Sequence, residues 1–101
     1  GSDFESKWRQ LSGNVYGRRH RYYPFNGILT EYGGTNWEED VAEWVAETYQ
    51  LYRLPHYSFI AQYFMRGVVI ADDRYAAKLL LLKDYGFITD KVYEIVARYI
   101  K

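Results

Sequence analysis

Apolar residues recur every three or four positions through the C-terminal two thirds of this chain, which is the spacing of one face of an α-helix. The pattern is clearest over residues 37–52, where it predicts a helix. Asn36 and Glu39 stand three positions apart and predict a capping box at its start. The predicted inner face consists of Trp37, Val41, Trp44, Val45, Thr48 and Tyr52. A chain built from such repeats has to bury helix faces against one another.

Pro55 predicts the start of a second helix over residues 56–66, because proline is well accommodated in a first turn. Its predicted inner face consists of Tyr57, Ile60, Ala61 and Phe64. Gly67 is expected to end this helix. The β-branched run over 68–70 has no evident strand partner, so we expect it to be a buried connector.

Two more helices are predicted after residue 71. The pair Asp72-Asp73 predicts a cap for a helix over 74–84, and Thr89 predicts a cap for the last helix. Gly86 suits the left-handed residue that follows a helix end. The predicted inner face of the last helix consists of Val92, Ile95, Val96 and Tyr99. Four helices with short joints predict an all-α, four-helix bundle-like domain over 36–101.

Residues 1–35 are predicted to form a basic N-terminal arm and an irregular, aromatic-rich loop. A short helix is expected over 4–11, where Phe4, Trp8 and Leu11 share one face. Residues 12–36 contain Pro24 and five glycines, which break regular structure. The same stretch carries the aromatic residues Tyr16, Tyr22, Tyr23, Phe25 and Tyr32. A loop of this composition is expected to be held against the domain or against a partner.

Aromatic side chains make up 20 of the 101 residues, and 12 of them are tyrosine. A tyrosine ring packs while its hydroxyl stays hydrated or bonded, so this composition suits interfaces as well as a tyrosine-rich core. The absence of cysteine excludes disulfides, thiol catalysis and cysteine-ligated zinc. No apolar run approaches the ~20 residues of a membrane span, and the start shows no signal-peptide pattern.

Charge is segregated along the chain although the formal net charge is zero. Residues 1–30 carry five basic residues against two acidic ones, residues 31–52 carry six acidic residues and no basic one, and residues 53–101 carry eight against five. Such a distribution favours ordered association, or an anionic partner on one side of the molecule.

The sequence predicts no enzyme, no cofactor and no metal site. Only His20 and His56 could act as imidazole bases, and neither stands beside an evident nucleophile. There is no glycine-rich phosphate loop and no HExxH motif. The acidic runs Asp72-Asp73 and Glu38-Glu39-Asp40 are interpreted as helix starts, and the latter lies outside the apolar stripe of its helix.

The most specific local motif is the basic run Arg18-Arg19-His20-Arg21, which is followed by Tyr22-Tyr23. Guanidinium groups bind phosphate bidentately and neighbouring aromatic rings pack against sugar, which predicts sequence-independent contact with a nucleic-acid backbone. The alternative is a solvated loop that pairs with the acidic helix face over 38–47. The predicted DNA-binding residues are Lys7, Arg9, Arg18, Arg19, His20, Arg21, Arg53 and Arg66.

A second basic set consists of Arg53, Arg66, Arg74, Lys78 and Lys83. Arg74 and Lys78 are four residues apart and are expected to share an outward face, where such side chains mostly serve solubility. Read as a helix-turn-helix, the chain would present a recognition helix over 74–84. That helix lacks the Gln, Asn, Ser and Arg side chains that read base edges, so sequence-specific readout is not expected.

Residues 37–101 resemble a known family in the order and spacing of their elements. An amphipathic helix with Val41, Val45 and Tyr49 is followed by the segment Ser58-Phe59-Ile60-Ala61-Gln62-Tyr63, an Ala/Leu-rich helix from Ala76 to Tyr85, and a final helix with Val92, Val96 and Ile100. This order resembles the helical domain of the major coat proteins of rod-shaped and filamentous archaeal viruses, the rudivirus and lipothrixvirus group.

The resemblance implies a structural coat subunit that self-associates, or pairs with a paralogous coat subunit, and wraps double-stranded DNA. It implies a location in the virion, with assembly in the host cytoplasm and, in some members, contact with a lipid envelope. The basic residues near the start would then be what remains of a DNA-gripping arm. The alternative is a protein–protein interaction module or small regulator with no nucleic-acid role, which the acidic helix and the tyrosines favour.

Overall fold

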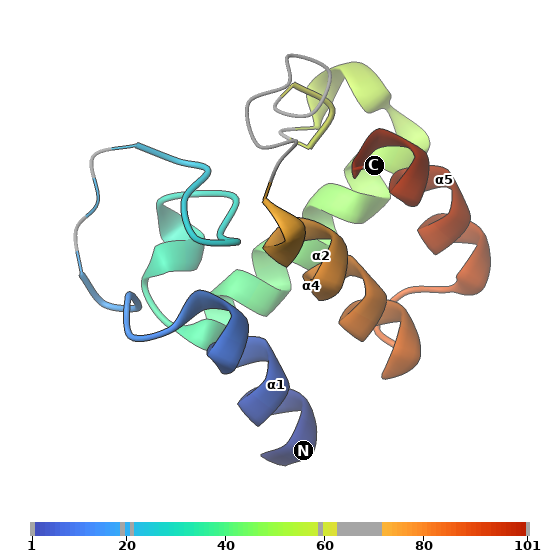
Figure 1. The fold of residues 1–101 in the computed structure, drawn as a ribbon. Helices are drawn as coiled ribbons and strands as arrows, with labels where there is room; N and C mark the ends of the chain where they lie inside the picture. The colour runs from blue at the N-terminus through green and yellow to red at the C-terminus, as the bar shows by residue number, and fades with distance from the viewer. Residues whose placement is uncertain (1, 19, 21, 59, 63–71, 101) are drawn as a thin grey trace.

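The computed structural model describes residues 2–18, 20, 22–58, 60–62 and 72–100. This part of the chain contains four complete α-helices, two short 3-10 turns and a helical stretch over 60–62, and it contains no β-strand (Figure 1). The α-helices are α1 (Ser2–Ser12), α2 (Trp37–Arg53), α4 (Asp73–Asp84) and α5 (Asp90–Ile100), and the 3-10 turns are η1 (Tyr32–Gly34) and η2 (Pro55–Tyr57). The predicted all-α fold is confirmed.

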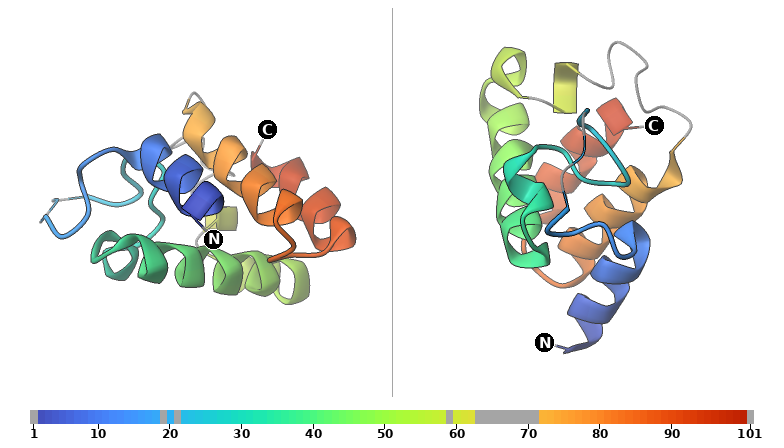
Figure 2. Two further views of the ribbon diagram at one scale, coloured as in Figure 1. Left: turned by 90° about the horizontal axis from the view of Figure 1, so that it is seen from below. Right: turned by 90° about the vertical axis from the view of Figure 1, so that its left-hand side faces the viewer.

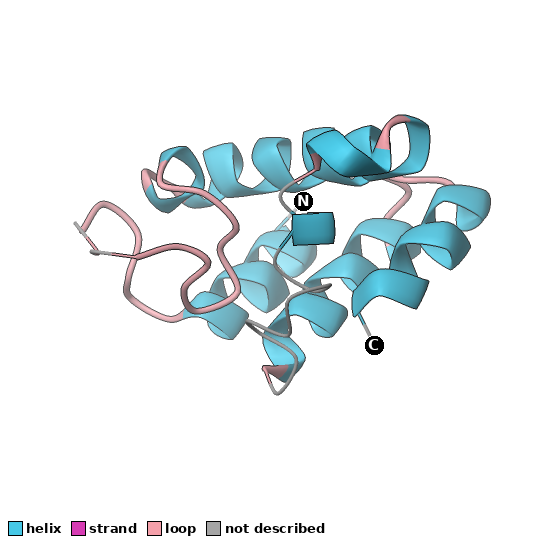
Figure 3. Cartoon of the chain, turned by 90° about the horizontal axis from the view of Figure 1, so that it is seen from above, coloured by secondary structure: helices cyan, strands magenta, loops and turns pink. Residues whose placement is uncertain are grey.

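The helices form two layers. α1, α4 and α5 lie side by side, with α4 in the middle, and α2 crosses below them (Figure 2). The same layering is visible from the opposite side, where the loops gather at one end of the molecule (Figure 3). Aromatic rings join the two layers: Trp44 of α2 lies 6.0 Å from Tyr75 of α4 and 6.2 Å from Trp8 of α1 between ring centroids.

The helix starts follow the predicted capping chemistry. The Glu39 amide donates to the Asn36 side chain at 2.8 Å, and the Val92 amide donates to the Thr89 hydroxyl at 3.1 Å. The Arg74 amide donates to the Asp72 carboxylate at 3.0 Å. These bonds satisfy amides that have no partner within their own helices. Gly86 has φ +79°, as predicted for the residue after a helix end.

Pro55 begins a helical turn, as predicted, but not the α-helix expected over 56–66. The turn is the short 3-10 helix η2, Ser58 after it has extended backbone, and residues 60–62 are helical. The Ser58 hydroxyl accepts a hydrogen bond from the Ile60 amide at 3.1 Å. Ser58 therefore supplies a capping oxygen, which the side chain of Pro55 could not do. The predicted helix end at Gly67 and the connector over 68–70 lie outside the described residues.

The N-terminal third shares one core with the helices that follow it. Phe4 and Trp8 of α1 are buried, and so are Ile28 and Leu29 of the loop. Two aromatic side chains of the helices hold the loop backbone: Trp44 Nε1 donates to the Gly27 carbonyl at 3.0 Å, and the Tyr75 hydroxyl donates to the Ile28 carbonyl at 3.2 Å. The aromatic-rich loop is therefore held against its own domain.

Candidate functional site

The basic residues of α1 are exposed and paired within the helix. Lys7 lies 3.4 Å from Asp3, and Arg9 lies 2.9 Å from Glu5, in each case four residues apart. Solvent screening makes such exposed pairs weak, so a phosphate could compete for either cation. Hydrogen bonds with the Tyr85 hydroxyl and with Asp3 raise the pKa of Lys7.

Arg18 differs from these two residues because it has no carboxylate partner in the part of the chain that the structure describes. It is exposed. Arg18 therefore does not form the ion pair with the acidic face of α2 that the alternative interpretation predicts. Arg19 and Arg21, the two other arginines of the motif, lie outside the described residues, as does Arg66.

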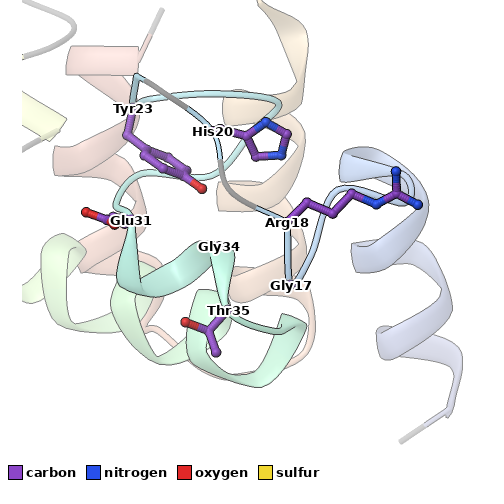
Figure 4. Close-up of a pocket in the computed structure, with 7 residues that line it drawn as sticks. All are labelled: Gly17, Arg18, His20, Tyr23, Glu31, Gly34 and Thr35. Atoms are coloured by element: carbon purple, nitrogen blue, oxygen red, sulfur yellow. The ribbon is translucent and has the colours of Figure 1, made fainter.

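A polar hollow of about 180 Å³ lies at the C-terminal end of α1 and brings two predicted residues together. It is lined by Arg9, Gly13, Asn14, Tyr16 and Arg18, and we call it the Arg9–Arg18 hollow. Gly13 has φ +70° and turns the chain out of α1, so that Arg18 comes back beside the helix. Figure 4 shows the Arg18 side chain reaching toward α1, away from Glu31 and Thr35.

A second pocket, of about 220 Å³, lies on the other side of Arg18 (Figure 4). Its side chains include His20, Tyr23, Glu31 and Thr35. The His20 ring stacks on Phe25 at 4.1 Å between centroids, so the loop holds it in place. The Tyr23 hydroxyl lies over Gly34, where any Cβ would overlap it. Because Glu31 lines this pocket, it is less suited to an anion than the Arg9–Arg18 hollow.

The remaining predicted cations are spread over the molecule. Arg53 is the last residue of α2, and this end of the helix lies opposite the loop that carries Arg18 (Figures 1 and 2). Arg74 forms a 2.8 Å ion pair with Asp72, and the Arg74 side chain lowers the pKa of that carboxyl by hydrogen bonding. The Lys83 ammonium lies 5.3 Å from the centre of the Tyr93 ring. The second basic set therefore forms no common patch among the described residues.

The positions of Lys78 and Asp40 contradict two predictions from the sequence. Both were expected to face solvent, and both side chains are fully buried, with Lys78 Nζ 2.6 Å from Asp40 Oδ2. The helical repeat carried the signal, because Lys78 shares its face with Tyr75, Leu79 and Leu82, and Asp40 shares its face with Trp44 and Thr48.

A network of polar groups surrounds this pair and joins α1, the loop, α2 and α4. Lys78 Nζ also donates to the Ser12 hydroxyl at 2.6 Å and to the Tyr16 hydroxyl at 3.2 Å. Asp40 Oδ2 accepts from Trp8 Nε1 at 3.1 Å and from the Tyr16 hydroxyl at 2.5 Å. The Ser12 hydroxyl in turn donates to the Asn26 carbonyl at 2.6 Å.

Burial shifts both members of the pair toward their neutral forms. It lowers the pKa of Lys78 to about 8 and raises the pKa of Asp40, while their attraction and mutual hydrogen bond oppose both shifts. Asp40 Oδ1 is buried without a hydrogen-bond partner in the described part of the molecule. With no solvent access to either side chain, the arrangement serves to connect elements.

The described residues give no support for a metal centre or a membrane span. Within the ranges that the structure describes, no three His, Cys, Asp or Glu side chains are grouped so as to hold a metal ion. No described helix combines the length and apolar character needed to cross a membrane. Comparison of the chain with protein-family models, with curated proteins and with solved structures finds no match.

Proposed function

We propose that this chain is a non-enzymatic structural subunit that coats double-stranded DNA by binding phosphates without reading the base sequence. The observation that supports the proposal is the Arg9–Arg18 hollow, which is lined by Arg18, an exposed arginine without a carboxylate partner among the described residues, and by Arg9, whose exposed pair with Glu5 a phosphate would have to displace. Two guanidinium groups and the Asn14 side-chain amide supply hydrogen-bond donors suited to the oxygens of a phosphate group. Phosphate contacts of this kind position a protein on the duplex and carry no sequence information.

The formal net charge of zero limits the strength of this binding. Each neutralised phosphate contributes about −0.9 to the slope of log affinity against log salt, so a site with two arginines gives a shallow slope. A coat protein tolerates weak single contacts because many copies bind one duplex. In this proposal the protein acts in a virion and assembles in the host cytoplasm. A lipid envelope would be an additional partner.

The experiment is a titration of random-sequence duplex DNA at several salt concentrations between about 50 and 300 mM. The double variant Arg9→Ala/Arg18→Ala should weaken binding equally for every sequence and reduce the salt slope by about 2. The matched control is Arg98→Ala, an exposed arginine on α5, on the far side of the molecule from the loop. Unchanged affinity and slope in the double variant, or no DNA binding by the unaltered chain, would exclude the proposal.

A second candidate, a protein–protein interaction module without a nucleic-acid role, is favoured by exposed aromatic rings. Tyr22 is 74 % exposed and Tyr57 is 72 % exposed, and tyrosine is a residue type enriched at protein interfaces. This candidate predicts that Tyr22→Ser or Tyr57→Ser weakens partner binding, whereas Arg9→Ala/Arg18→Ala has no effect. The same variants therefore distinguish the two candidates.

A further inference from the structure

A groove between α1 and α4 forms an apolar surface apart from the Arg9–Arg18 hollow. It encloses about 340 Å³ and is lined by Leu11, Ala77, Leu80 and Leu81, with the polar residues Lys7, Gln10 and Asp84 on its rims. Leu80 is 42 % exposed. The two helices run antiparallel, because Ser12 bonds to Lys78 at one end and the Tyr85 hydroxyl bonds to Asp3 at the other. We call this surface the α1–α4 groove.

The apolar surface continues beyond the rims of the groove. Tyr85 and Phe87 follow α4, and their rings lie 5.3 and 4.7 Å from the Phe4 ring of α1. Both side chains are more than a third exposed. Together with Leu80 they account for three of the seven exposed large hydrophobic residues in the described part of the chain. Tyr85 adjoins the groove, because its hydroxyl bonds to Lys7 of the groove lining, and clustered exposed apolar side chains of this kind mark docking surfaces.

The rims carry charges that complement each other. Lys7 lies on the α1 side, and Asp84 lies on the α4 side at the same level, because Lys7 Nζ donates to the hydroxyl of the next residue, Tyr85, at 3.1 Å. A two-fold axis parallel to the groove would exchange the two rims. It would place Lys7 opposite Asp84 of the partner subunit, and Asp84 opposite the partner's Lys7.

We infer that the α1–α4 groove binds a second copy of this chain about such an axis, with α1 of each copy packed on α4 of the other. This contact closes on itself, and the rim charges would pair across it in addition to their exposed partners within the chain, Asp3 for Lys7 and Lys83 for Asp84. The inference adds a self-association face to the proposed function, but it rests on the groove alone and is tested without DNA. Failure of DNA binding would leave it standing.

The size of the face sets the expected affinity. Helices of 11 and 12 residues are about 17 and 18 Å long, so one face of α1 and α4 with two aromatic rings covers less than the ~800 Å² per partner of a standard interface. We therefore expect a dimer that dissociates in the micromolar range. Sedimentation equilibrium from about 5 to 500 µM should show a reversible monomer–dimer equilibrium. A monomer throughout this range would overturn the inference.

A polar substitution locates the interface. Leu80→Glu should weaken dimerisation at least tenfold, because it places a carboxylate in the apolar centre of the contact. The matched control is Leu54→Glu, which alters a leucine of similar exposure at the other end of the molecule, after α2, and should leave the equilibrium unchanged. Circular dichroism checks that both variants are folded. Equal effects of the two variants would overturn the inference.

Charge reversal tests the symmetry of the contact. Lys7→Glu alone would bring a new carboxylate against Asp84 of the partner subunit, and Asp84→Lys alone would place two ammonium groups together, so each should dimerise at least tenfold more weakly. An equimolar mixture of the two variants pairs opposite charges at both rims and should form the heterodimer preferentially. A mixture that associates no better than the separate variants would overturn the two-fold arrangement.

Discussion

Lys78 and Asp40 bring opposite charges into contact where neither side chain reaches solvent. Burying two charges is costly, and their attraction offsets this cost only while both partners remain. Lys78→Met would strand the Asp40 carboxylate, so we expect the free energy of unfolding to fall by about 3–5 kcal/mol. Adding Asp40→Asn removes that charge and keeps a carbonyl oxygen for Trp8 and Tyr16. The double variant should therefore be more stable than Lys78→Met, as measured by urea denaturation.

The control for this cycle is Lys83→Met on the same helix, where the side chain is a third exposed and its nearest carboxylate lies 3.9 Å away. It should change stability by no more than about 0.5 kcal/mol. If the losses in Lys78→Met and Asp40→Asn simply add in the double variant, the two side chains do not act as a pair.

The depressed pKa of Lys78 predicts a stability that rises with pH. In the folded state this pKa is about 8, against the ordinary 10.5 of an unfolded lysine, so between these values the unfolded state binds more protons. Below pH 8 the folded state bears the whole free-energy cost of burying the Lys78 ammonium, and this cost disappears as the pH approaches 10.5. Between about pH 7.5 and 9.5 the free energy of unfolding should rise by about 1–2 kcal/mol from this group. Lys78→Met should not show this rise, and an equal rise in both proteins would contradict the assignment.

At the scale of elements, the sequence predicts whatever depends on neighbours along the chain. The capping residues Asn36, Asp72 and Thr89 indicated the starts of α2, α4 and α5 because each bonds an amide two or three positions away. The path of the loop could not be predicted in this way. It depends on contacts with distant side chains, such as the bonds from Trp44 and Tyr75 to loop carbonyls. The Arg9–Arg18 hollow was predicted only as a loose basic patch, since its shape depends on the turn at Gly13.

Substitutions at two glycines of the loop distinguish the cost of backbone strain from the cost of close packing. Gly13 has φ +70° and open space where a Cβ would lie, so Gly13→Ala should cost about 1 kcal/mol from its left-handed backbone alone. Gly27 has φ +81°, and an added Cβ would lie 3.2 Å from the Arg74 Cβ. Gly27→Ala should therefore cost about 1 kcal/mol more. Thermal denaturation of both variants measures the difference, and equal losses would show that the loop moves freely away from α4.

At the scale of the whole molecule, the predicted arm contains a helix, α1, which packs into the same core as the later helices. α1 contributes Phe4 and Trp8 to the core, and Trp8 donates to the buried Asp40 carboxylate. Its Arg9 faces outward to the Arg9–Arg18 hollow, and its Leu11 lines the α1–α4 groove. One helix thus supports the fold and contributes to both proposed surfaces. A basic arm that ordered only on DNA would bury none of these side chains beforehand.

Removal of α1 tests this view of the molecule. Truncating a buried phenylalanine or tryptophan costs about 3–5 kcal/mol, so loss of Phe4 and Trp8 together approaches the ~5–15 kcal/mol stability of an ordinary domain. A chain that begins at residue 13 should therefore lose its cooperative thermal transition and its near-ultraviolet circular dichroism. The control is the full chain with Ser6→Ala and Gln10→Ala, two exposed positions of α1, which should unfold cooperatively. A shortened chain that keeps a sharp transition would show that α1 is a separable arm.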